Sequence, residues 1–158
     1  MTWLGQPIEV RYSDNLRDTA GNPAHAATFI RRRLIVLDHE LQSDAREHER
    51  ILLHEMFHFV WVRLGNGKRH AWEEHLRAEF SGRARGEAGW SAEWRKHGLT
   101  GADVTRRTKK WREYCCESFC DTAACVFGDA PSEVTLAPGR MVARRAWFAK
   151  QLEKTFPI

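Results

Sequence analysis

Three ionisable side chains lie together inside an otherwise apolar stretch, LLHEMFHF at residues 52–59. His54 and His58 are four residues apart, so on a helix they share one face and their imidazoles can converge on one metal ion. Glu55 lies about 100° further around that helix, beside the ion and not bound to it. A carboxylate in this position can act as general base toward a water molecule that zinc activates. The spacing therefore predicts a hydrolytic zinc site.

A second pair of acidic residues, Glu117 and Asp121, is also four residues apart, within the apolar and cysteine-rich segment 109–128. Because a catalytic zinc takes a third protein ligand, we expect Glu117 to supply it. Asp121, one turn later, is expected to accept the free ring N–H of a zinc-bound histidine and so to fix its tautomer. Tyr114 precedes Glu117 by three residues, and its hydroxyl could hydrogen-bond the oxyanion of a tetrahedral intermediate. A half-buried structural role is an equal alternative for this tyrosine.

The motif H-E-x-x-H, followed on a later helix by E-x-x-x-D, resembles that of the gluzincin metallopeptidases. The layout is most similar to ImmA/IrrE-like and minimal gluzincin metallo-endopeptidases, and the resemblance covers residues 35–59 and 114–127. It implies a zincin-like fold, one Zn²⁺ per chain, a peptide or protein substrate and hydrolysis by metal-activated water. The matching positions are the zinc ligands His54, His58 and Glu117, the general base Glu55 and the orienting residue Asp121.

Two other functions remain open from the sequence. His70, His75 and Glu79 follow the motif at distances where other zincins take a third ligand. With the basic pI near 9.1, they support a SprT-like, DNA-associated zinc protease with a histidine as third ligand. Alternatively, the zinc is structural, and the tryptophan-rich segment 66–108 binds a partner without any catalysis.

The elements that must position these residues can be predicted from periodicity and turn signals. Asp44 and Glu47 resemble a capping box at the start of a helix of about twenty residues that ends near Gly65. The order predicts an α+β fold, with a small N-terminal antiparallel or mixed sheet packed on the long zinc-binding helix and followed by further helices. We expect strands at 8–12 and 27–38, short helices at 70–80 and 91–97 in an insertion spanning 66–108, and further helices at 109–128 and 139–156.

Composition limits the class of protein. A chain of 158 residues with 42% hydrophobic and 29% charged residues fits a single domain, 1–158, with its own core. It lacks a long apolar run and a secretory signal, so we expect a cytoplasmic protein without membrane contact. The four cysteines fall within residues 115–125 and are expected to be reduced and mostly packed in the core. Because 25 basic residues are interleaved with 21 acidic ones, a solvated surface is favoured over a nucleic-acid-binding one. The oligomeric state stays open.

Overall fold

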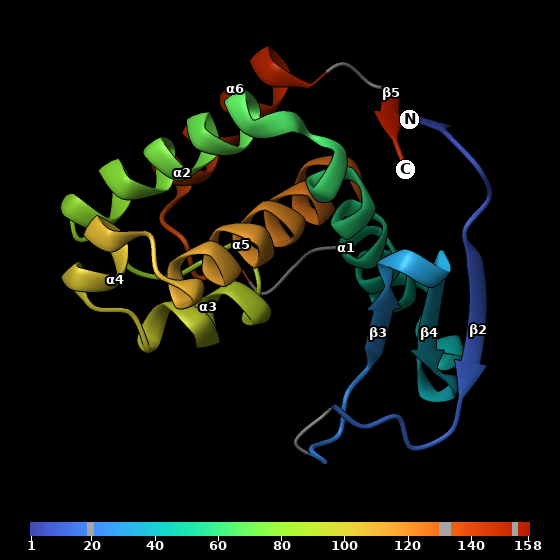
Figure 1. Ribbon diagram of the computed structural model, residues 1–158. Helices are drawn as coiled ribbons and strands as arrows, with labels where there is room; N and C mark the ends of the chain where they lie inside the picture. Colours follow the sequence, from blue (N-terminus) through green and yellow to red (C-terminus); the bar gives the residue numbers. More distant parts are fainter. Residues whose placement is uncertain (19–20, 130–133, 153–154) are drawn as a thin grey trace.

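The computed structural model describes residues 1–18, 21–129, 134–152 and 155–158 of the chain (Figure 1). In this part of the chain the fold is α+β, with six α-helices and two small sheets. Figure 1 shows the strands on one side of the molecule and helices α2, α3, α4 and α6 on the other, with α1 between the two parts. The predicted α+β class is thus confirmed.

The larger sheet is mixed and has three strands in the order β2-β4-β3. Strand β2 (Glu9–Ser13) is parallel to β4 (Leu34–Asp38), whereas β3 (Ala26–Phe29) is antiparallel to it. The short 3₁₀ turn η1 (Ile30–Arg32) connects β3 to β4 and so divides the segment 27–38, which was expected to form strand, into two strands. In this order β4 is the central strand, and it is largely buried, while β2 and β3 form the two edges of the sheet.

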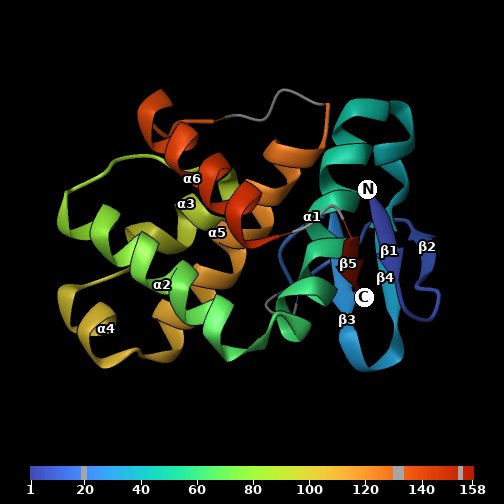
Figure 2. The same cartoon turned by 90° about the horizontal axis from the view of Figure 1, so that it is seen from above.

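A second sheet joins the two ends of the chain. Strand β1 (Thr2–Leu4) is parallel to β5 (Thr155–Pro157), and the two lie side by side in Figure 2. The sequence predicted a helix up to residue 156, which is wrong, because the last helix ends earlier and β5 follows it. Phe156 is fully buried, with its ring 5.5 Å from that of Trp3, and this pairing with the N-terminus overrides the helical pattern.

Two long helices form the centre of the molecule. Helix α1 (Ala45–Arg63) begins after the short 3₁₀ segment η2 (His39–Ser43), with Asp44 accepting hydrogen bonds from the first backbone N–H groups. Helix α5 (Lys109–Phe127) packs along α1 through buried aromatic rings such as those of Phe57 and Phe119, whose centroids are 6.0 Å apart. Both helices lie close to their predicted bounds.

The remaining helices cover α5 on its other sides. Helix α2 (Gly65–Ser81) follows α1 almost without a break and is longer than predicted. Helices α3 (Trp90–His97) and α4 (Gly101–Arg106) come next, and α6 (Pro138–Gln151) runs beside α2, as Figure 2 shows. No helix in the described segments combines the length and apolar character that crossing a membrane would require.

Candidate metal centre

Helices α1 and α5 bring three predicted ligand residues together. The Oε2 atom of Glu117 lies 3.2 Å from Nε2 of His54 and 3.9 Å from Nε2 of His58. The two imidazole rings stand edge to face, with centroids 5.0 Å apart. Their side chains are only 7% and 19% exposed, and that of Glu117 is 14% exposed. Two residues on successive turns of α1 and one on the facing part of α5 therefore present their polar atoms to each other.

Asp121 lies behind His54, on the side away from Glu117. Its Oδ1 atom is 2.7 Å from Nδ1 of His54, and its Oδ2 atom accepts a hydrogen bond from the backbone N–H of Ala92 at 2.9 Å. A carboxylate at Nδ1 keeps the proton of the neutral ring on that nitrogen, so that Nε2 is the nitrogen that can bind a metal in place of a second proton. Asp121 thus contacts a ring nitrogen of one motif histidine, and its role in orienting a metal ligand stays a prediction.

Glu55 is held from the sheet side of the site. Its Oε2 atom accepts a hydrogen bond of 2.6 Å from the hydroxyl of Thr28 and lies 4.0 Å from Nε2 of His58. Thr28 belongs to the edge strand β3, so this strand runs past the carboxylate. Sequence reasoning did not single out Thr28, because nothing in a short strand indicates which helix side chain it will face.

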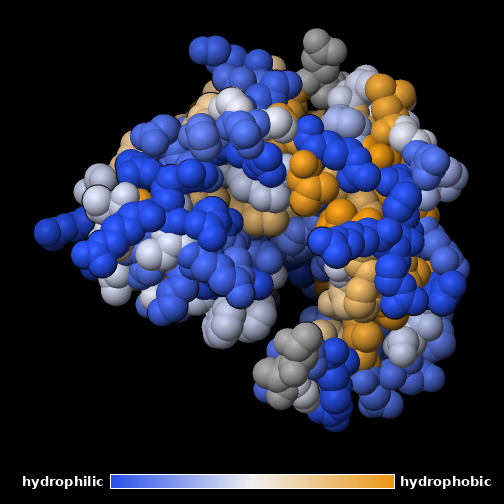
Figure 3. All heavy atoms as spheres, viewed as in Figure 1, coloured by the Kyte–Doolittle hydropathy of each residue, from blue (hydrophilic) through white to orange (hydrophobic). Residues whose placement is uncertain are grey.

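Arg95 is a second residue that sequence reasoning missed. Its Nη2 atom lies 3.2 Å from Oε1 of Glu117, so the guanidinium contacts the carboxylate oxygen that does not face the histidines. Arg95 is on α3, and its position beside α5 depends on the path of the segment between α2 and α5. The site is consequently enclosed by α3 on one side and β3 on the other, and Figure 3 shows the surface hollowed between these two parts of the molecule.

Cysteine thiols approach the opposite edge of one imidazole. The Sγ atoms of Cys116 and Cys120 lie 3.4 and 3.5 Å from Nδ1 of His58. His54, His58 and Cys120 each offer one ligand atom within 4.8 Å of the others, and this group could hold a metal ion. None of the four cysteines, all of which lie in the described part of the chain, forms a disulfide bond, in agreement with the expectation that they are reduced. The interpretation of Cys120 as a core residue alone was incomplete, since its sulfur also faces the candidate site.

The charges of the site favour a cation at the histidines. Burial lowers the pKa of His54, but the charge and hydrogen bond of Asp121 outweigh it and raise this pKa well above its usual value. Burial likewise opposes the charge on His58, whose pKa is nevertheless raised to about 9 by Cys116, Glu117 and Glu55. Burial raises the pKa of Glu117, yet the two histidines and Arg95 bring it down to about 2. Without a metal, protons on the imidazoles provide the positive charge that a divalent cation would replace.

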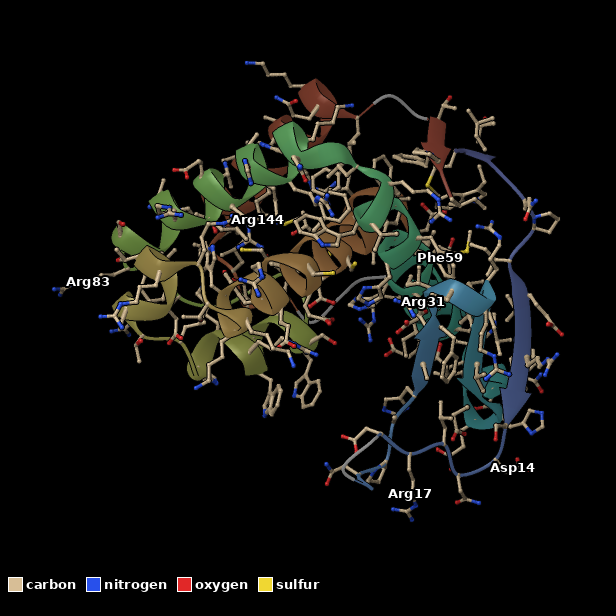
Figure 4. All side chains as sticks on the ribbon, in the orientation of Figure 1. Asp14, Arg17, Arg31, Phe59, Arg83 and Arg144 are labelled. Atoms are coloured by element: carbon tan, nitrogen blue, oxygen red, sulfur yellow. The ribbon has the colours of Figure 1, made fainter. Side chains whose placement is uncertain are left out.

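Tyr114 does not reach this site, which corrects the prediction that its hydroxyl could bind an oxyanion. The hydroxyl donates a hydrogen bond of 2.5 Å to Oε1 of Glu87, and the residue is 1% exposed. Glu87 also pairs with Arg144, whose side chain lies inside the helical part of the molecule in Figure 4. Tyr114 therefore belongs to a buried network of charged groups and cannot contact a substrate.

The rival third ligands also lie elsewhere. Glu79 forms an ion pair of 2.6 Å with Arg144, and Nε2 of His75 lies 3.3 Å from Glu79. His70 is exposed on α2. Among the described residues, none of these three groups is joined to His54 or His58, so nothing in this geometry favours the arrangement with a third histidine ligand.

Comparisons with models of protein families, with curated proteins and with solved structures found no match for this chain. The resemblance to gluzincins therefore depends on the residues of α1 and α5 and on the distances between them.

Proposed function

We propose that this protein is a zinc metallopeptidase of the gluzincin type that hydrolyses peptide bonds. One observation carries the proposal: Glu117 faces Nε2 of both motif histidines from a separate helix, while Asp121 holds Nδ1 of His54. An H-E-x-x-H sequence that arose by chance is not expected to lie opposite two carboxylates in this arrangement. A peptidase role also agrees with the edge strand β3 beside Glu55, where an extended substrate could add as a further strand.

The spacing of the three ligand atoms suits zinc. With metal–ligand bonds of about 2.0–2.1 Å and tetrahedral angles, neighbouring ligand atoms lie roughly 3.3–3.4 Å apart. The distance from Oε2 of Glu117 to Nε2 of His54, 3.2 Å, is close to this value, whereas that to Nε2 of His58, 3.9 Å, is about 0.5 Å longer. Two imidazoles and one carboxylate leave a fourth position open, as in catalytic and not in structural zinc sites.

Glu117 is a better third ligand than Cys120 for an electrostatic reason. A thiol binds metal as the thiolate, but burial raises the pKa of Cys120 well above its usual value, so the neutral form is favoured. Glu117 is ionised at neutral pH, because its pKa is about 2. The sulfur of Cys120 also lies at Nδ1 of His58, whereas Glu117 lies at Nε2.

The side chains have separable roles in this proposal. A bound zinc ion would supply Lewis-acid polarisation of the substrate carbonyl and a lower pKa for the attacking water. Glu55 takes the proton of that water and passes it to the leaving amine. Thr28 holds the Glu55 carboxylate through its hydroxyl, and Asp121 keeps His54 in the required tautomer.

The test combines metal analysis with hydrolysis of an unbiased peptide library. Wild-type protein is expected to contain close to one zinc per chain and to cleave peptides. Glu55→Gln should keep the zinc and lose turnover, because Glu55 is a base and not a ligand. Glu117→Ala should lose the zinc, while Glu74→Gln on the exposed side of α2 serves as the matched control and should change neither property.

Two results would contradict the proposal. Full zinc content in Glu117→Ala would remove this residue from the ligand set. Equal inertness of the wild type and Glu55→Gln toward every peptide would favour a non-catalytic, zinc-stabilised binding module instead.

A further inference from the structure

Two tryptophans on α3 are exposed to solvent beside the candidate site. All seven tryptophans lie in the described part of the chain, and of these only Trp90 and Trp94 are exposed, by 68% and 62%. They are four residues apart, so they share one face of the helix. Their rings are stacked with an interplanar angle of 19° and centroids 6.4 Å apart. Such large aromatic side chains are usually covered, which makes an exposed pair a candidate contact surface.

The opposite face of α3 is tied to the metal centre. Ala92 is buried, and its backbone N–H donates to Asp121 at 2.9 Å. Gly89, just before the helix, lies so close to Asp121 that an added Cβ atom would come within 2.5 Å of its Cγ atom. Helix α3 is therefore held against α5 at the level of the candidate ligands, and the tryptophan pair has a defined position relative to them.

Arg95 connects the tryptophan pair to the site directly. One guanidinium contacts Oε1 of Glu117 at 3.2 Å and lies over the ring of Trp94, 5.6 Å from its centroid. The indole surface is thus separated from the carboxylate by the width of a single guanidinium group. An extended peptide advances about 3.3 Å per residue, so a side chain within roughly three residues of the reacting bond can reach the indoles.

We propose that Trp90 and Trp94 form a substrate subsite for an aromatic side chain. This proposal rests on the proposed peptidase function and identifies the class of peptide that the site accepts. Aromatic rings stack on an indole face and remove it from water, which a small or polar side chain does much less well. The positive charge of Arg95 over Trp94 disfavours lysine or arginine at the same position of the substrate.

The experiment uses matched blocked peptides in which Phe, Ala or Lys is placed in turn at each position on both sides of a cleaved bond. Wild-type protein is assayed for cleavage, and Glu55→Gln is titrated with the same peptides by calorimetry, so that binding is measured without turnover. At one position, Phe is expected to be preferred over Ala by about tenfold, with Lys the poorest. Trp90→Ala and Trp94→Ala should remove this preference while keeping the zinc content. Val142→Ala is the control, since Val142 is equally exposed, by 66%, but lies on α6.

The outcomes separate the two proposals. If the wild type cleaves peptides and the preference persists in both tryptophan variants, the subsite is wrong and the peptidase function stands. If no peptide is cleaved but Phe peptides bind in a manner that depends on Trp94, the subsite stands and the peptidase function fails. A preference for Lys, or peptide binding that is unchanged in both Trp90→Ala and Trp94→Ala, overturns the proposed subsite.

Discussion

Replacing Asp121 by asparagine should weaken zinc binding strongly while leaving the shape of the residue unchanged. Both carboxylate oxygens are engaged, one with Nδ1 of His54 at 2.7 Å and the other with the backbone N–H of Ala92 at 2.9 Å. An amide has only one oxygen, so its NH₂ group must face one of these two donors. Removing such a carboxylate partner from a metal-bound histidine typically costs about 10- to 100-fold in affinity, or roughly 1.4–2.7 kcal/mol. The donor that is left unpaired adds about 1–3 kcal/mol of lost folding stability.

Competition with a chromophoric chelator at neutral pH measures the zinc affinity, and urea denaturation of the metal-free protein measures stability. Asp103→Asn is the matched control, because the Asp103 carboxylate also accepts a backbone N–H, from Thr100, but on α4. It should lower stability and leave zinc affinity unchanged. If a folded Asp121→Asn protein binds zinc as tightly as the wild type, Asp121 does not support a metal-bound histidine and the reasoning is refuted.

Further predictions concern the supports of the site and the buried charges. Gly89→Ala should weaken zinc binding about tenfold or more, because its Cβ atom would come within 2.5 Å of the Asp121 carboxyl carbon. Cys120→Ser should keep its zinc in metal analysis, since we assign the third ligand to a carboxylate. Arg144→Met should lower the free energy of unfolding in urea by about 3–5 kcal/mol, because it removes the buried guanidinium that pairs with the carboxylates of both Glu79 and Glu87. Burial raises the pKa of Glu79, but His75 and Arg144 lower it to about 2 from its usual value of 4.5. The ionised carboxylate therefore stabilises the folded protein fully above about pH 4.5. Its contribution is lost as pH falls toward 2, so Glu79→Gln should flatten the stability profile in this range.

Neighbouring substitutions provide the controls for these predictions. Gly98→Ala should bind zinc normally, because the nearest atom to its Cβ would be the Arg95 carbonyl oxygen at 3.7 Å. Arg145→Met should cost much less than Arg144→Met, since the Arg145 guanidinium is partly exposed and donates to one carbonyl. Zinc loss in Cys120→Ser would instead assign the metal to the group of two histidines and this thiol.

Some parts of the fold follow from local sequence and others from pairings over long distances. The bounds of α1 and α5 were predicted within a few residues, because capping residues and apolar periodicity act within one helix. Strand β5 was missed, since its pairing with β1 joins residues at opposite ends of the chain, Thr2 with Thr155. A helical pattern in the last residues could not reveal that Phe156 enters the core as part of a strand.

The same distinction separates Tyr114 from Glu117. Helical spacing places both near one side of α5, but spacing does not say which neighbour that side will meet. The side chain of Glu117 meets the histidines of α1, whereas that of Tyr114 meets Glu87 from the segment before α3. A difference of about 60° around the helix is enough to send the two side chains to different partners.

The sequence by itself determined that His54, Glu55 and His58 share a buried helix and that Glu117 and Asp121 share another, since positions on one helix are set by 3.6-residue periodicity. Only the tertiary structure decided that Glu117 faces both imidazoles, that Thr28 holds Glu55 and that Arg95 joins the site to exposed tryptophans. These contacts connect elements far apart in the chain, and their geometry depends on how the apolar faces of whole helices pack together.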